Sequence, residues 1–213
     1  MESLSKSLGA IGEVVIFLLL SIIYTSLILL PIILINLLLD KSLISYIFLF
    51  VPLIGLFGLA IERSFMGVRN VFVNQKSFYR PYFKELLTEK ILGKYLTYCF
   101  LFSLYFYSAD SLRILENENP ALFILRIFLS LSLRNIIFYT ILQKAFREEL
   151  GFVDTIKNSA LLTMKYPLYS IMIFFVWGLI EKLILKNILW TYVLVIILGF
   201  LGNFINQTKV KNL

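Results

Sequence analysis

Residues 14–39 form a long apolar run that carries no charged side chain, and this run limits the possible folds most strongly. A helix that crosses a bilayer needs about 20 mostly apolar residues. A second uncharged run, residues 43–61, follows after only three residues. Over the whole chain, 60% of residues are hydrophobic and 15% are charged, against about 45–50% and about 25% in soluble domains. These values exclude a disordered chain, a coiled coil and an ordinary soluble enzyme, and they predict an integral membrane protein.

Four further apolar segments follow, and they are interrupted by few charges. They are residues 91–109, 121–142, 160–180 and 188–205. The sequence therefore predicts an all-α, polytopic membrane protein: one domain, a six-helix transmembrane bundle with amphipathic cytoplasmic helices. Lys182 and Lys186 flank a short turn between the last two segments. These two segments have an alternative interpretation as one helical hairpin that does not cross the membrane.

The basic residues predict the orientation of these spans. With the N-terminus inside, fourteen of the 20 Lys and Arg residues fall in inner segments, four in outer turns and two within the fourth span. Short loops rich in Lys and Arg stay in the cytoplasm. We therefore expect a multi-pass protein of the cell membrane with both termini in the cytoplasm. The net charge of +7 is then explained by contact with anionic lipid headgroups, and no nucleic-acid partner is predicted.

Two amphipathic patterns lie in the inner segment that follows the second span. The first has apolar residues at helical spacing, which predicts that the second span continues as a helix beyond the lipid: Ile61, Phe65, Val68 and Phe72. The second has aromatic and aliphatic residues on one face of a helix: Tyr79, Tyr82, Phe83, Leu86 and Leu87. This second face is a candidate surface for docking another protein subunit. The alternative is a helix that lies on the membrane and closes the cytoplasmic end of the bundle.

The inner segment after the fourth span shows a weaker version of this design. The fourth span is expected to run on as a helix to Gly151, which is a residue type that commonly ends helices. Asp154 is expected to cap a new helix. That helix is expected to lead directly into the fifth span.

Polar side chains within the predicted spans are candidate functional residues, because an ionisable group in a span normally faces the bundle interior or water. Arg126 and Arg134 are eight residues apart in the fourth span, so they share a helix face approximately. Asn135 is next to Arg134, and Asp110 or Glu116 is a possible partner of Arg126. One interpretation is a polar path or an anionic-ligand site. The other is helix–helix packing, with Arg126 extending to the outer surface.

The residues needed for several common chemistries are missing. The chain has no histidine and one cysteine, Cys99. This excludes a His-ligated metal site, a Ser-His-Asp or Cys-His catalytic group and an intrachain disulfide. No glycine-rich phosphate loop is present, and no acidic residue lies within the predicted spans, which argues against a carboxylate proton relay. We therefore predict a protein that is not an enzyme and has no cofactor or metal.

Four stretches of the chain resemble the YesL family of bacterial membrane proteins, whose biochemical activity is undetermined. They are Leu30-Pro31 at the first span, SFYRPYFKELL at residues 77–87, SLYFYSAD at 103–110 and TIKNSALLTMKYPLYSIMI at 155–173. Members of the family are often encoded beside carbohydrate ABC importers. The resemblance implies an accessory subunit that docks onto the permease or ATPase subunits of such an importer. The alternatives are a substrate-capturing subunit of an energy-coupling-factor importer and a small stand-alone membrane transporter.

Overall fold

The computed structural model describes residues 47–69, 91–116, 119–147, 150–183 and 188–206, together with six isolated positions between residues 12 and 30. This part of the chain contains helices and no strand, which confirms the all-α class for the described residues. The helices are α2 (Ile47–Val68), α4 (Ile91–Glu116), α5 (Ala121–Phe146), α6 (Phe152–Lys165), α7 (Pro167–Leu183) and α8 (Ile188–Ile205).

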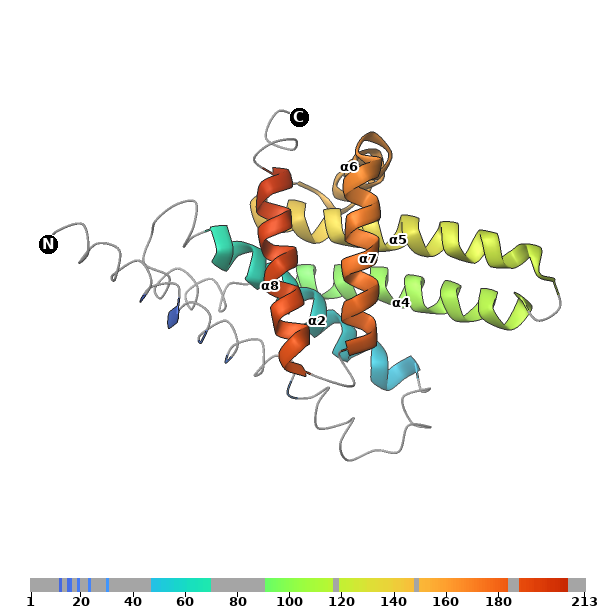
Figure 1. Cartoon of the computed structure of the whole chain (residues 1–213), viewed down its shortest axis with the longest axis horizontal. Coiled ribbons are helices and arrows are strands. Elements are labelled where there is room, and N and C mark those ends of the chain that lie inside the picture. The colour runs from blue at the N-terminus through green and yellow to red at the C-terminus, as the bar shows by residue number, and fades with distance from the viewer. Residues whose placement is uncertain are drawn as a thin grey trace, which may run out of the picture.

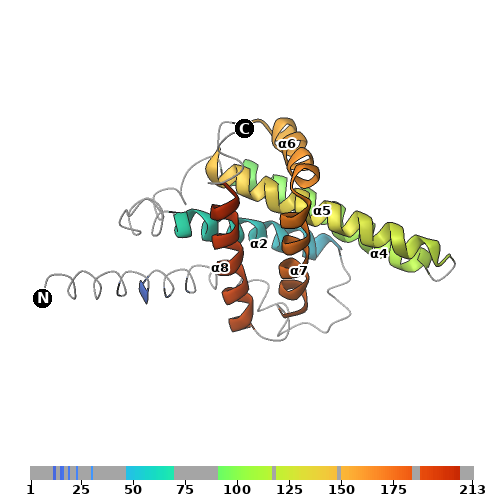
Figure 2. The same cartoon turned by 45° about the horizontal axis from the view of Figure 1, so that its top comes forward.

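Two helical hairpins surround the central helix α2. Helices α4 and α5 lie side by side and run in opposite directions, and α7 and α8 form a second antiparallel pair (Figure 1). The second pair runs steeply across the first, and the turned view in Figure 2 shows the same crossing. Helix α2 packs against α4, α8 and α5. Its side chains from Ile54 to Val68 are almost all buried as a result.

Aromatic side chains fill the core where α2, α4 and α7 meet. The ring of Phe57 lies edge-on to Phe102 at 6.0 Å and to Trp177 at 6.3 Å between centroids. Phe102 and Trp177 stack at 5.7 Å. Offset and edge-on ring pairs add to the free energy gained by burying these large side chains. This core packs together α2, α4 and α7, which are three of the four helices that carry the polar clusters described below.

The described helices can be compared with the apolar segments of the sequence. Helix α8 has the bounds of the predicted span 188–205, and α2 continues past residue 61 to Val68. Ile61, Phe65 and Val68 are all buried, and they face the bundle. The remaining member of that pattern, Phe72, lies outside the described residues, as do the predicted first span and the predicted docking face of residues 79–87.

The predicted fifth span, residues 160–180, is broken in the structure. Helix α6 ends at Lys165, and α7 begins at Pro167 after a bend of 105°. Proline lacks a backbone N–H and suits the first position of a new helix, which explains the location of the break. Residues 160–180 are therefore not one continuous helix.

Two expected helix ends also differ from the sequence reasoning. Helix α5 ends at Phe146 and does not reach Gly151, which instead precedes the first residue of α6. The carbonyl of Gly151 accepts hydrogen bonds from the backbone N–H of Thr155 at 3.0 Å and from its hydroxyl at 2.7 Å. Asp154 lies in the first turn of α6 and does not cap it. A carboxylate in the first turn still interacts favourably with the helix dipole.

Among the described residues, one helix is long and apolar enough to cross a membrane, and this is α5. Helices α6 and α7 pass the same test only when the bent pair is taken as one span. The described part of the chain therefore supplies one such span, or two if the bent pair counts.

Candidate functional site

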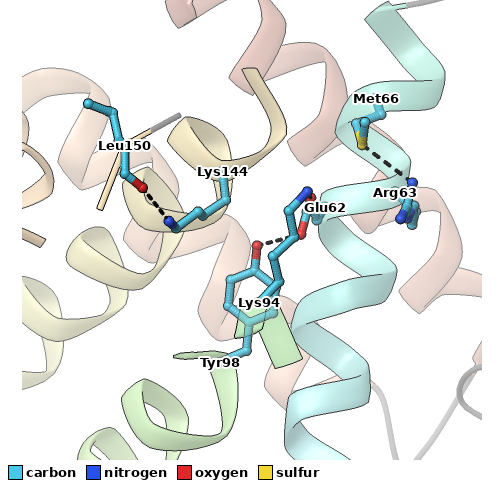
Figure 3. Close-up of polar contacts among 7 residues, drawn as sticks. All are labelled: Glu62, Arg63, Met66, Lys94, Tyr98, Lys144 and Leu150. Atoms are coloured by element: carbon cyan, nitrogen blue, oxygen red, sulfur yellow. Dashed lines mark hydrogen bonds and ion pairs between the residues drawn. The ribbon is translucent and has the colours of Figure 1, made fainter. Parts of the chain in front are cut away.

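A buried ion pair joins α2 and α4, and we call it the Glu62 cluster after its carboxylate. The Lys94 ammonium donates to Oε1 of Glu62 at 2.7 Å, and the Tyr98 hydroxyl donates to Oε2 at 2.5 Å (Figure 3). Lys94 and Tyr98 are one helical turn apart on α4, so both reach the same carboxylate. Glu62 is 0% exposed. Both of its oxygens are satisfied, as burial of a charged group requires.

Two glycines in α2 allow α4 to approach closely enough to form this cluster. A Cβ atom at Gly55 would lie 2.3 Å from Sγ of Cys99, and one at Gly58 would lie 2.6 Å from Cγ of Tyr98. Both distances are shorter than van der Waals contact allows. Glu62 follows Gly58 by one turn on the same face of α2. The bare backbone at Gly58 therefore lets the Tyr98 side chain lie close to α2 and direct its hydroxyl to Glu62.

Further cations surround the Glu62 cluster. Lys144 of α5 donates to the carbonyl of Leu150 at 2.7 Å. Figure 3 shows Lys144 on the α5 side of the carboxylate and Arg63 on the opposite side of α2. The guanidinium of Arg63 is buried and lies 3.7 Å from Sδ of Met66. Among the described residues, Lys94, Lys144 and Arg63 thus lie around the Glu62 carboxylate.

A second polar cluster joins α4, α5 and α7, and we call it the Arg134 cluster. Nε of Arg134 donates to the Tyr105 hydroxyl at 2.8 Å, and Nη2 pairs with Glu181. The guanidinium also lies 4.7 Å from the centre of the Phe174 ring, which is a cation–π distance. The side chains of Arg134 and Glu181 are 14% and 25% exposed. This cluster is therefore less enclosed than the Glu62 cluster.

The four residues predicted from the sequence as one intramembrane cluster lie in separate places. Arg126 pairs with Glu116 at 2.7 Å, close to the α4–α5 turn. Asp110 lies 3.8 Å from Arg113, and both are exposed. The Asn135 amide donates to the Leu131 carbonyl at 2.7 Å within α5.

The described residues thus supply a carboxylate partner to each of the two arginines predicted to line a polar path. Arg126 is paired with one carboxylate and Arg134 with another. Neither Asp110 nor Asn135 has a hydrogen bond or ion pair to either arginine in the described contacts. This arrangement suits helix packing.

The sequence reasoning missed the carboxylates of the two clusters, because Glu62 and Glu181 each lie one residue beyond a predicted span. For Glu62, the predicted topology did contain an indication of its partner. Residues 43–61 and 91–109 were expected to be joined on the inner side. Their inner ends, where Glu62 and Lys94 lie, should therefore be at the same depth. For Glu181 the steep crossing of α7 over α5 is needed, and no sequence pattern indicated it.

The chemistry available to these clusters is limited. Within the described ranges, no group of three or more His, Cys, Asp or Glu side chains is placed to hold a metal ion. The absence of a cofactor and of enzymatic activity stay predictions. The clusters are built from ion pairs and tyrosine hydroxyls, which hold helices together.

No family model, no curated protein and no solved structure matches this chain. The resemblance to the YesL family therefore stays a prediction from the residues quoted above.

Proposed function

We propose that the chain is a multi-pass protein of the cell membrane that acts as a non-catalytic accessory subunit beside a carbohydrate ABC importer. The membrane part of this proposal depends on the polarity of the helix surfaces. The accessory part depends on the resemblance to the YesL family. The two parts are tested separately below.

Helix α6 carries the membrane argument, because it turns its hydroxyl face inward and its apolar face outward. The side chains of Thr155 and Ser159 are 0% exposed. Ser159 accepts a hydrogen bond from the Gln143 amide of α5 at 2.7 Å. On the other side of α6, Leu161 is 64% and Met164 is 81% exposed. In water this arrangement is unfavourable, because apolar area stays hydrated. Contact of the apolar face of α6 with lipid removes that cost.

Helix α5 also exposes an apolar surface that suits lipid, and this surface is longer than that of α6. Only 17% of its most apolar window of 18 residues is buried inside the protein. Large side chains such as Ile124, Leu125 and Phe128 are exposed on it. Soluble monomers rarely expose apolar patches beyond a few hundred Å². The hydrocarbon of a bilayer is the solvent that suits such a surface, and the distribution of Lys and Arg supports an even number of crossings.

Labelling of introduced cysteines tests this topology. The single native thiol is first removed by Cys99→Ala. Two exposed lysines then become reporters: Lys157→Cys on α6 and Lys182→Cys on α7. A membrane-impermeant maleimide added to intact cells should label the Lys182→Cys variant and leave the Lys157→Cys variant unlabelled until the cells are opened. Equal labelling of both in intact cells would contradict the proposed topology.

The accessory role follows from the family resemblance, and the described geometry is compatible with it. The Glu62 and Arg134 clusters each join polar groups of different helices, as expected of a scaffold. The partner would be a permease or ATPase subunit of a carbohydrate ABC importer. Contact would be made through the predicted docking face of Tyr79, Tyr82, Phe83, Leu86 and Leu87.

Co-purification with the importer tests the docking. The double variant Phe83→Asp/Leu87→Asp should abolish co-purification of the permease subunits in mild detergent. Lys84→Asp is a matched control, because it changes the charge by the same two units on the opposite predicted face. Normal co-purification of the double variant, or equal loss in the control, would rule out docking through this face. Sugar transport by the purified chain alone in liposomes would replace the accessory role with that of a stand-alone transporter.

A further inference from the structure

The bend between α6 and α7 separates two helices of different composition. Helix α6 carries Asp154, Lys157 and Lys165 within 14 residues, whereas α7 has no charged residue before Glu181. Helix α6 is also the least apolar of the described helices, although large apolar side chains are exposed on it. A helix of this kind is typical of a membrane interface, whereas α7 has the composition of a short span.

One stripe of α6 points away from the protein along the whole helix. It consists of Val153, Lys157, Leu161 and Met164, which are all exposed and follow one another at helical spacing. A charge in the middle of an apolar stripe is costly inside the hydrocarbon of a bilayer. At the interface, the long Lys157 side chain can extend its ammonium to the headgroups while its stem stays among apolar groups. We call these four residues the outward stripe, and they suit the boundary between headgroups and acyl chains.

A second line of side chains on α6 is polar. Asp154, Asn158 and Lys165 each follow a member of the outward stripe by one residue, so they lie about 100° further round the helix. Asp154 and Lys165 are exposed. A third side, with the buried Thr155 and Ser159, packs on α5. These three sides fit a helix that lies flat, with water above it, lipid beside it and the protein on its inner side.

The bend sets the orientation of α6 relative to a bilayer that α7 crosses. With the axis of α7 along the membrane normal, the 105° bend places the axis of α6 about 15° from the membrane plane. Hydrogen bonds hold α6 at this depth, because the Ser159 hydroxyl accepts from Thr140 at 3.0 Å and from Gln143 at 2.7 Å. Both donors lie at the end of α5 that is expected on the cytoplasmic side.

We propose that α6 lies flat in the cytoplasmic surface of the membrane, at the boundary between headgroups and acyl chains, and that the chain enters the bilayer at Pro167. This inference rests on the membrane location proposed above. The surface that α6 fits is the lipid itself. Acyl chains contact the apolar members of the outward stripe, the Lys157 ammonium reaches the anionic headgroups, and the polar line faces the cytoplasm.

Depth measurements by spin labelling test this orientation. Single cysteines in the full-length Cys99→Ala chain carry a nitroxide, and the protein is reconstituted into vesicles of phosphatidylcholine and phosphatidylglycerol. Collisions with oxygen and with a water-soluble nickel complex give the depth of each label. Val153→Cys and Met164→Cys form the α6 pair, and Leu168→Cys and Leu179→Cys form the matched α7 pair. The members of each pair are eleven residues apart, and all four native side chains are exposed.

The two pairs should give different depth profiles, although eleven residues cover about 16 Å of helix axis in both. The α6 labels should differ in depth by about 4 Å, and both should lie about 5–10 Å below the headgroup boundary. The α7 labels should differ by about 15 Å at the usual tilt of a span. If a label at Met164 or Leu168 disturbs the bend, Leu161→Cys and Met172→Cys replace them, and the expected differences scale with the spacing.

Three results would overturn the inference. A depth difference on α6 as large as that on α7 would mean that α6 enters the hydrocarbon. Labels in water on α6, together with a depth gradient on α7, would place α6 off the membrane and leave the membrane proposal intact. Labels in water at all four positions would remove the membrane location, and the inference about α6 with it.

Discussion

The Glu62 cluster and the Arg134 cluster are both ion pairs between helices, but they differ in how completely water is excluded. Glu62 is fully buried and accepts hydrogen bonds from Lys94 and Tyr98. In the Arg134 cluster, a quarter of the Glu181 side chain is exposed. Glycines bring the helices together at the first cluster, whereas a long Arg side chain and an aromatic ring fill the space at the second. The enclosed pair should therefore tolerate substitution far less than the open one.

Removing the Glu62 carboxylate should have the largest effect. Glu62→Ala removes the carboxylate to which the buried Lys94 ammonium donates, and breaking a buried pair in this way costs about 3–5 kcal/mol. The free energy of unfolding in detergent micelles measures the loss. The paired change Glu62→Met/Lys94→Met should recover most of it, because both charges of the pair are removed together. Equal destabilisation by the single and paired changes would show that the ion pair is not what Glu62 contributes.

The close approach of α2 and α4 should be the next most sensitive feature. Gly58→Ala places a methyl group 2.6 Å from the Tyr98 ring, and the forced shift should cost about 2–3 kcal/mol. Gly93→Ala in α4 is the matched control, since nothing lies within 4 Å of its Cβ position. That change should stabilise the helix by about 0.5–1 kcal/mol. Melting temperatures of the two variants should move in opposite directions.

The Arg134 cluster should show a smaller loss. Arg134→Gln removes the contacts with Glu181 and Tyr105, but a quarter of the Glu181 side chain is already exposed. We expect a loss of about 1–2 kcal/mol in the free energy of unfolding. A loss as large as that of Glu62→Ala, measured in the same micelles, would show that exposure does not separate the two clusters.

Removing the exposed pair between Asp110 and Arg113 should have the smallest effect on the free energy of unfolding. These groups lie 3.8 Å apart on the surface of α4. Asp110→Asn should change the free energy of unfolding by less than about 0.5 kcal/mol, because exposed ion pairs contribute little. A clear shift in the melting temperature would indicate a partner for Asp110 other than Arg113.

Hydrophobic patterning predicted the helical class and much of the helix placement. The apolar run 188–205 became α8, and the spacing of Ile61, Phe65 and Val68 identified the buried face of α2. These features are local, because each depends on the order of polar and apolar residues along one helix. The break before Pro167 was also visible as a proline, but the apolar residues on either side favoured one continuous span.

The polar contacts depend on tertiary arrangement, and the sequence predicted them less well. Of the partners considered for Arg126, Glu116 is the one that the structure pairs with it. The pairing of Arg134 with Glu181 needs α7 to cross α5 steeply, and helix crossing is set by packing between side chains far apart in the sequence. The glycine contacts that position Tyr98 beside Glu62 arise in the same way.

The bend between α6 and α7 limits the length of α7, because it sets where that helix begins. Helix α7 has 17 residues, which gives a length of about 25 Å at 1.5 Å per residue, whereas the hydrocarbon layer of a typical bilayer is about 30 Å thick. In the membrane location proposed above, lipids next to a helix this short would compress to match it, at a modest elastic cost for each ångström of mismatch. The protein should therefore partition into thinner bilayers and leave regions enriched in long, saturated acyl chains.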